Sequence, residues 1–150
     1  MAQSLSKILI HLAFSTKERR PLIDADVERD LHRYLNATCA NLGCAAHEVG
    51  GVADHVHVFF SLSRTITVAR FVEKIKTSSS KWIKTKGERY QPFAWQGGYG
   101  AFSISQSDFE ACCRYVARQR EHHKKMDFKE EFRLLLKRYG IEYDERYVWD

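Results

Sequence analysis

The order of the predicted strands and helices places this chain of 150 residues in the α+β class. Short runs rich in β-branched and aromatic residues alternate with longer segments in which apolar residues recur every three or four positions. The predicted order is strand, helix, strand, strand, helix, strand, without an internal repeat. This order is typical of the ferredoxin-like (split βαβ) fold, an antiparallel sheet with helices packed on one face. We therefore expect the other face of the sheet to be free for a ligand.

The first strand and helix are predicted within residues 7–43. Residues 7–15 are rich in apolar, β-favouring side chains and predict a strand, which a turn follows. A helix should begin after Asp24 and end at Gly43. Its apolar face is formed by Val27, Leu31, Tyr34, Leu35, Thr38 and Leu42.

Residues 44–52 and 55–62 predict two further strands. Only Ala53 and Asp54 separate them, which indicates an antiparallel β-hairpin. We expect the second of these strands to lie in the centre of the sheet.

The second half of the chain predicts a helix from after Thr65 to about Thr85, with most of its lysines outside the apolar stripe. Residues 87–98 contain Pro92 and three glycines and predict a loop, and residues 99–104 predict the last strand. Ser107 is expected to cap a third helix, and Asp127 a fourth that reaches Tyr139.

The composition agrees with one compact domain over residues 1–150, since a chain of this length can bury a sizeable core. The 24 Lys and Arg residues outnumber the 19 Asp and Glu residues, and the net charge of +5 favours a polyanionic partner. No CxxC pair, secretory signal or apolar run of about 18 residues is found, so we expect a reduced cytoplasmic protein without a membrane role.

The segment His55-Val56-His57 is the strongest chemical signal in the chain. Side chains alternate along a strand, so both imidazoles lie on one face, while Val56, Val58 and Phe60 lie on the other. Imidazole nitrogens bind several divalent metals, which makes the pair a candidate metal site. The alternative is an ordinary strand with two half-exposed histidines.

The second chemical signal is the pair Tyr115 and Gln119. Residues 112–123 contain no Gly or Pro and predict one helix, on which positions i and i+4 share a face. A phenol and an amide oxygen could thus be presented together to the histidine strand. Taken singly, each residue has an ordinary structural explanation. Tyr115 could be a core aromatic residue with a hydrogen-bonded hydroxyl, and Gln119 could be a solvated polar residue.

These motifs, in this order, resemble the insertion-sequence-200-like (TnpA-type) single-tyrosine HUH transposases, which include the repeat-associated tyrosine transposases. The resemblance covers nearly the whole chain. It comprises residues 11–20 (HLAFSTKERR), 50–57 (GGVADHVH), 71–76 (FVEKIK), 95–100 (WQGGYG), 115–119 (YVARQ), His122-His123 and the tail 139–147 (YGIEYDERY).

The resemblance implies an enzyme and assigns roles to residues. His55, His57 and Gln119 would bind a divalent metal ion, Mg or Mn, and Tyr115, on a helix added near the C-terminus, would be the nucleophile. The expected activity is DNA transposition: cleavage and rejoining of single-stranded DNA at element ends that carry a hairpin, through a 5′-phosphotyrosine intermediate. A covalent intermediate of this kind needs no nucleotide triphosphate, and the chain has no P-loop motif.

The resemblance also implies a homodimer, in which the tyrosine helix could act on the histidines of its own subunit or of the partner. The protein is expected in the cytoplasm of a prokaryotic cell, associated with the nucleoid when bound. Candidate DNA-binding residues are Lys17, Arg19, Arg20, Lys74, Lys81 and Arg118, with Trp82 or Tyr90 as stacking surfaces.

Some alternatives stay open. His123 lies one turn beyond Gln119 and could replace it as a metal ligand. We nevertheless expect His122 and His123 to be basic surface residues near a helix end. His47 and Glu48 are more remote candidates for the metal ligand. Other possible functions are a noncatalytic ferredoxin-like protein that binds single-stranded nucleic acid, and a replication-initiator or relaxase-like HUH nickase.

Overall fold

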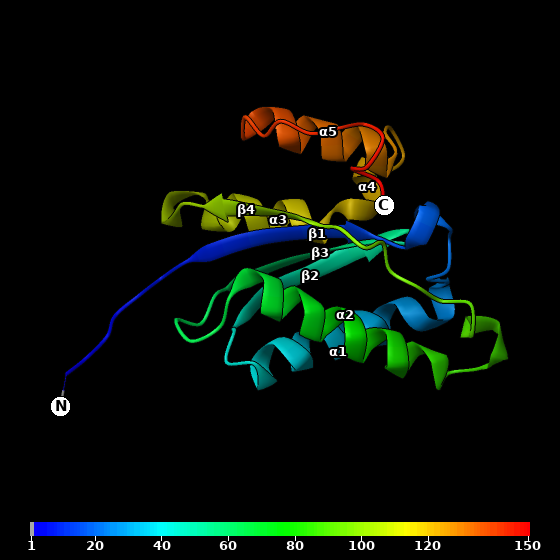
Figure 1. Cartoon of the computed structure of the whole chain (residues 1–150), viewed down its shortest axis with the longest axis horizontal. Helices are drawn as coiled ribbons and strands as arrows, with labels where there is room; N and C mark the ends of the chain where they lie inside the picture. Colours follow the sequence, from blue (N-terminus) through cyan, green and yellow to red (C-terminus); the bar gives the residue numbers. More distant parts are fainter. Residues whose placement is uncertain (1) are drawn as a thin grey trace.

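The computed structural model describes residues 2–150, which form a four-stranded antiparallel sheet between two layers of helices (Figure 1). The strand order is β2-β3-β1-β4, so the histidine-bearing strand β3 lies inside the sheet, as predicted. The α+β, ferredoxin-like arrangement is confirmed. The strands are β1 (Leu9–Ser15), β2 (Ala46–Val52), β3 (His55–Ser61) and β4 (Gly100–Ile104).

Helices α1 (Ala25–Asn41) and α2 (Val68–Lys84) cover one face of the sheet. The Asp24 carboxylate caps α1, and Gly43 adopts a left-handed φ of 72° just beyond the end of this helix, as the sequence predicts. The main core lies between this layer and the sheet. Its largest fully buried side chains include Phe14, Phe60 and Phe71.

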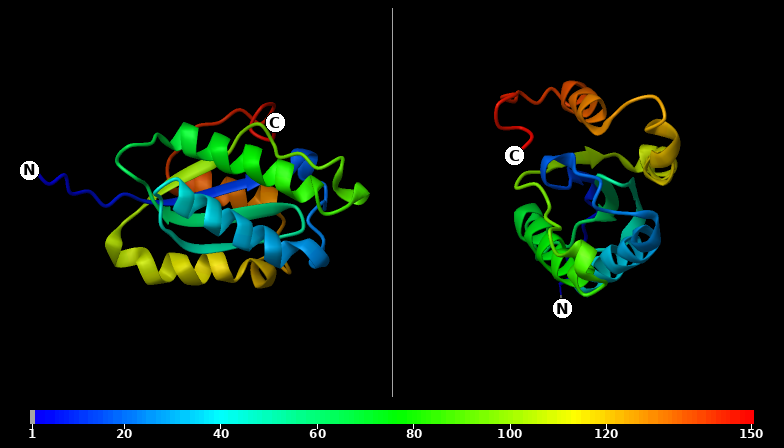
Figure 2. Two further views of the ribbon diagram at one scale, coloured as in Figure 1. Left: turned by 90° about the horizontal axis from the view of Figure 1, so that it is seen from below. Right: turned by 90° about the vertical axis from the view of Figure 1, so that its right-hand side faces the viewer.

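The other face of the sheet is covered as well, so the expectation of a free face is wrong (Figure 2). Helix α3 (Phe109–Ala117) packs on β2 and β3, and α5 (Phe128–Arg138) lies over β1 and β4. The physical reason is that this face also carries apolar side chains. Phe59 packs against α3, while Phe102 packs against α5.

The helix predicted over residues 112–123 is broken. Arg118 has φ −101° and ψ 27°, which ends α3, and the short helix α4 (Gln119–His122) follows. Ser107 does not cap α3: it lies in a 3₁₀ turn, η3 (Gln106–Asp108), and its hydroxyl contacts Ser105. The Asp127 cap of α5 is confirmed, because its carboxylate accepts from the Glu130 amide.

The remaining turns and the C-terminal segment complete the fold. Two 3₁₀ turns, η1 (Lys17–Arg19) and η2 (Glu88–Tyr90), follow β1 and α2. The segment after α5 returns across the molecule, so that the Gly98 amide donates to the Asp150 carbonyl. Within residues 2–150 no helix has both the length and the apolar character needed to cross a membrane.

The close approach of β2 to α3 generates the first testable prediction. A Cβ atom at Gly50 would lie 2.0 Å from the Val116 carbonyl oxygen, so Gly50→Ala must push α3 away from the sheet. Overpacking of this kind costs about 1–3 kcal/mol. We expect thermal denaturation to show a lower melting temperature for Gly50→Ala. Gly97→Ala is the control, because its Cβ would have only ordinary contacts; equal melting temperatures for the two variants would contradict the packing argument.

Candidate active site

The two histidines of β3 point to the same face of the sheet, as the alternation predicts. Both side chains are fully buried, which rules out the alternative of two half-exposed histidines. Val56 and Val58 point to the opposite face and join the main core. The face with His55 and His57 meets α3, α4 and α5.

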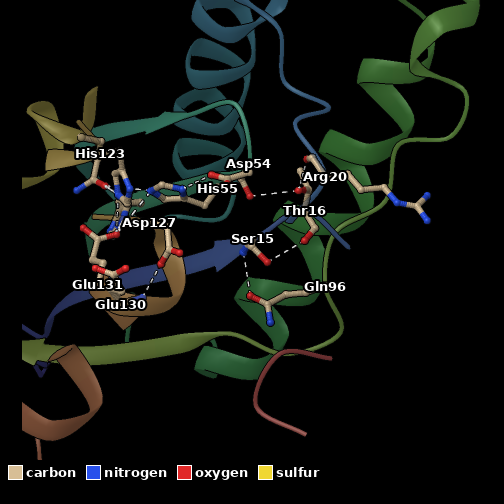
Figure 3. A network of polar contacts seen from close by, with 12 residues as sticks. Ser15, Thr16, Arg20, Asp54, His55, Gln96, His123, Asp127, Glu130 and Glu131 are labelled. Atoms are coloured by element: carbon tan, nitrogen blue, oxygen red, sulfur yellow. Dashed lines mark hydrogen bonds and ion pairs between the residues drawn. The ribbon is translucent and has the colours of Figure 1, made fainter. Parts of the chain in front are cut away.

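His55 is held between a carboxylate and an amide. Its Nδ1 lies 2.7 Å from Asp54 Oδ1, so Nδ1 carries the hydrogen and donates it to the carboxylate. Its Nε2 faces Gln119 Oε1 at 3.1 Å (Figure 3 shows His55 and Asp54). In the neutral ring Nε2 is then an acceptor that faces the amide oxygen, an arrangement that suits a cation.

His57 lies between Glu131 and a third histidine. Its Nε2 is 3.0 Å from Glu131 Oε1, and its Nδ1 is 2.7 Å from Nε2 of His11 on β1. Burial lowers the pKa of His57, although the Glu131 carboxylate partly opposes this shift. Burial, together with neighbouring His57, lowers the pKa of His11 to about 3, so His11 is neutral and can either donate to His57 or accept from it.

Glu131 on α5 is the centre of the cluster. Its carboxylate is buried and contacts His57, His123 and the hydroxyl of Tyr115. Burial alone would raise its pKa, but the charge of His57 and the hydrogen bonds from its three partners hold that pKa well below its ordinary value. Glu131 is therefore ionised.

Tyr115 reaches the same cluster from α3. Its hydroxyl donates a short hydrogen bond to Glu131 Oε2, and its ring packs edge-on against His11 and His57. Burial and then the adjacent carboxylate raise the pKa of this phenol well above its ordinary value. The side-chain amide of Gln119 donates to the Tyr115 carbonyl at 3.3 Å, so these two residues stay one turn apart despite the break at Arg118.

The donor atoms fit a divalent metal ion. Ligand atoms of His55, His57 and Glu131 all lie within 4.8 Å of one another. Gln119 Oε1 and Glu131 Oε1 each lie 3.1 Å from His123 Nε2, and His57 Nε2 lies 3.0 Å from Glu131 Oε1. Neighbouring ligands around an octahedral ion with bonds of about 2.1 Å are separated by about 3 Å, so these spacings are compatible with one divalent ion bound by several of these atoms.

The structure thus brings together Tyr115, His55, His57 and Gln119 within one chain, and it corrects the expectation for His123. This side chain is only 10 % exposed and touches both Gln119 and Glu131, so it belongs to the cluster and not to the surface. His47 lies elsewhere, hydrogen-bonded to Ser61. Tyr90 is buried with its hydroxyl bonded to Asp24, so it offers no stacking surface.

The candidate DNA-binding residues lie in three separate places. Lys17, Arg19 and Arg20 follow β1, where the Thr16 amide donates to the carbonyl of Asp54, next to His55 (Figure 3). Lys74 and Lys81 are exposed on α2, in the opposite helix layer. Arg118 is exposed at the break between α3 and α4.

Three residues of the cluster were missed by the sequence reasoning. Asp54 directly precedes His55 in the sequence. His11 is a polar residue among the apolar residues of β1, and it shares a face of that strand with Ala13. Both features could have been recognised from the sequence. Glu131 also carries a signal, because it lies three residues after Phe128 and four before Leu135, on the apolar stripe of α5, whereas Glu130 lies outside that stripe. The partners that Glu131 meets follow only from the docking of α5 on the sheet.

Comparisons with known proteins agree with this geometry. A putative transposase from Deinococcus radiodurans R1 has a similar structure, with a TM-score of 0.62 and 19% identity over 79% of this chain and 98% of that one. A REP-associated tyrosine transposase, solved bound to a REP hairpin, has a TM-score of 0.59 and 12% identity over 82% of this chain and 74% of that one. No curated protein sequence matches.

At these identities the two solved structures support the fold alone. A family model described as "Transposase IS200 like" matches residues 4–119, which is well over half of the chain. The matched region contains both histidines of β3, Tyr115 and Gln119. The chain therefore belongs to the IS200-like transposase family.

Proposed function

We propose that this transposase cleaves and rejoins single-stranded DNA at hairpin-bearing element ends, with Tyr115 as the nucleophile and a divalent metal ion held by the His55–His57 cluster. The observation that carries the proposal is the contact chain from the Tyr115 hydroxyl through Glu131 to His57. A phenol and two imidazoles converge there in a buried site, although β3 and α3 are far apart in the sequence.

The proposed reaction exchanges one phosphodiester for another. The Tyr115 oxygen attacks the phosphorus, a bond from Oη to phosphorus forms, and the bond to the 3′-oxygen breaks. The departing 3′-oxygen takes up a proton and becomes a hydroxyl, while the 5′-phosphate stays on the tyrosine. Attack by a 3′-hydroxyl in the reverse direction reseals the strand and frees Tyr115, so no nucleotide triphosphate is consumed.

The chain's own residues handle the phenolic proton and position the ligands. Glu131 Oε2 accepts the Tyr115 hydrogen bond, so this carboxylate is placed to receive the proton when Oη attacks. Asp54 fixes the hydrogen of His55 on Nδ1 and leaves Nε2 free as a ligand. His55, His57 and Glu131, with Gln119, would hold the ion. When bound, it would polarise the phosphoryl oxygens and offset the charge that develops on them.

The proposed DNA partner is supported by charge and by the REP hairpin bound to the related tyrosine transposase. The turn that carries Lys17, Arg19 and Arg20 follows Thr16, whose amide donates to the Asp54 carbonyl, so a phosphate backbone entering the site could meet this turn. Glu18 and Arg19 both adopt left-handed φ values, of 58° and 55°, which strains this turn. Such strain is typical of segments shaped for a ligand.

The nucleophile is tested by Tyr115→Phe. We expect the parent protein, incubated with a hairpin-bearing single strand and Mn, to form an adduct that survives denaturing electrophoresis, because the 5′-phosphate becomes esterified to tyrosine. The phenylalanine variant should form none. Tyr143→Phe, which changes an exposed tyrosine in the C-terminal segment, should react as the parent does. An adduct formed by Tyr115→Phe would show that another residue attacks.

The ligand set is tested by calorimetric titration with Mn in the absence of DNA. His57→Ala removes a buried ligand and should abolish measurable binding. Glu131→Gln keeps the side-chain shape but loses the charge, and we expect binding at least about tenfold weaker, since charge dominates the attraction for a hard cation. Glu130→Gln, its exposed neighbour on α5, is the matched control. Equal affinities for the two glutamine variants would remove Glu131 from the set.

The proposed site residues come together within one chain, and this supports action of each tyrosine on the histidines of its own subunit in a homodimer. If each tyrosine serves the histidines of its own subunit, Tyr115→Phe and His57→Ala subunits cannot complement each other. We expect no adduct from mixed heterodimers, assembled by refolding the two variants together and verified by mass spectrometry. Adduct at about a quarter to a half of the parental level would instead mean that α3 acts on the partner subunit.

A further inference from the structure

A shallow groove of about 650 Å³ runs between α2 and the segment 93–99, on the side of the sheet opposite to Tyr115. That segment includes the sequence Trp95-Gln96-Gly97-Gly98-Tyr99, to which the proposed chemistry assigns no role. The groove is lined by charged and aromatic side chains together with glycine backbone.

The wall formed by residues 95–98 is held in place by side-chain hydrogen bonds from and to α2. Lys76 on α2 donates to the carbonyls of Gln96, at 2.8 Å, and Gly98, at 2.6 Å, and its ammonium lies over the Phe14 ring. Burial lowers the pKa of Lys76 to about 8. The indole of Trp95 donates to the Ser79 hydroxyl at 2.9 Å. Lys76 is therefore occupied in shaping the loop and is not available to a ligand.

Three other side chains of the groove are available. The ring of Tyr99 is 38 % exposed and has no hydrogen-bond partner among the described residues; the Lys76 ammonium lies 5.8 Å from its centroid, on one face. Lys81 and Lys84 lie one turn apart on α2 and form no salt bridge with a carboxylate in residues 2–150. Glu73 is the one acidic residue among the described residues that line the groove, and it is paired with Arg70 at 3.2 Å. The groove thus offers an exposed aromatic ring beside two uncompensated positive charges.

The groove is connected to the candidate active site through hydrogen bonds. Gln96 lines its end, and Gln96 Oε1 accepts from the Ser15 amide at 2.8 Å. The next residue, Thr16, donates through its amide to the carbonyl of Asp54, whose carboxylate holds His55 (Figure 3). A strand that leaves the groove at Gln96 would arrive at the turn carrying Lys17 and Arg20, beside the histidine cluster.

We propose that this groove binds an unpaired stretch of the nucleic-acid substrate, with a base stacked on Tyr99 and the backbone phosphates held by Lys81 and Lys84. Single-stranded nucleic acids are commonly bound by such a pairing of an aromatic platform with cations along a groove. An acidic peptide would satisfy the lysines but would leave the Tyr99 ring unused. The inference deepens the proposed function and rests on it for the identity of the substrate as a single strand.

The test is equilibrium binding of a fluorescent oligothymidylate, with every groove variant built in the Tyr115→Phe background so that cleavage plays no part. Tyr99→Ala should weaken binding about tenfold, because a base loses its stacking partner. Tyr99→Phe should bind within about twofold of the background protein. In a titration with salt, Lys81→Gln/Lys84→Gln should reduce the log–log slope by about 1.4, at about 0.7 for each phosphate contact.

The control for charge is Lys7→Gln/Lys137→Gln, which removes two exposed lysines outside the groove and should leave the salt slope unchanged. Unaltered affinity of Tyr99→Ala, an unaltered slope for the Lys81 and Lys84 variant, or no binding by the background protein would overturn the proposal. Displacement by a decaglutamate peptide as effective as by unlabelled oligothymidylate would assign the groove to acidic peptides instead. Failure of the parent to form an adduct, with these groove effects intact, would contradict the proposed cleavage and not the groove.

Discussion

The buried carboxylate of Glu131 is the interaction on which the arrangement of the site depends. An ionised side chain with 2 % exposure is tolerated only if several hydrogen bonds replace its hydration. Its partners come from β3, from α3 and from the residues after α4, so one charge ties three parts of the chain together. Apolar packing docks α5 on the sheet, and the hydrogen bonds of Glu131 then link that helix to Tyr115 and the histidines.

The two faces of strand β3 contribute to different parts of the molecule: one to the main hydrophobic core and the other to the candidate active site. Its valines and Phe60 face α1 and α2, where the packing is mainly apolar. Its histidines face α3 and α5, where apolar contacts form two smaller clusters with polar groups between them. The family match ends at residue 119, while Glu131 and His123 lie beyond it. In this chain the site is therefore closed by a segment outside the matched region.

How much the sequence could predict depends on the range of the interactions involved. The shared face of His55 and His57 follows from strand alternation, and the Asp24 and Asp127 caps follow from local hydrogen bonding, so all of these were predictable. The break at Arg118 was not, because no Gly or Pro marks it. Glu131 was predictable in part: its place on the apolar stripe of α5 marks a buried carboxylate, but its partner His57, 74 positions away, follows only from the docking of α5. The same docking covers the sheet face that was expected to be free.

The contact between Tyr115 and Glu131 links the proposed nucleophile to the proposed metal ion. Burial, and after it the adjacent Glu131 carboxylate, raises the pKa of Tyr115, so removal of the phenolic proton is costly in this site. Burial lowers the pKa of His11 and His57, whereas at His123 burial is outweighed by the hydrogen bond and charge of Glu131, which raise the pKa. A divalent ion held by these residues would add positive charge beside the attacking oxygen and would lower the cost of removing its proton. Through Glu131, the proposed metal ion and the proposed nucleophile are therefore coupled electrostatically.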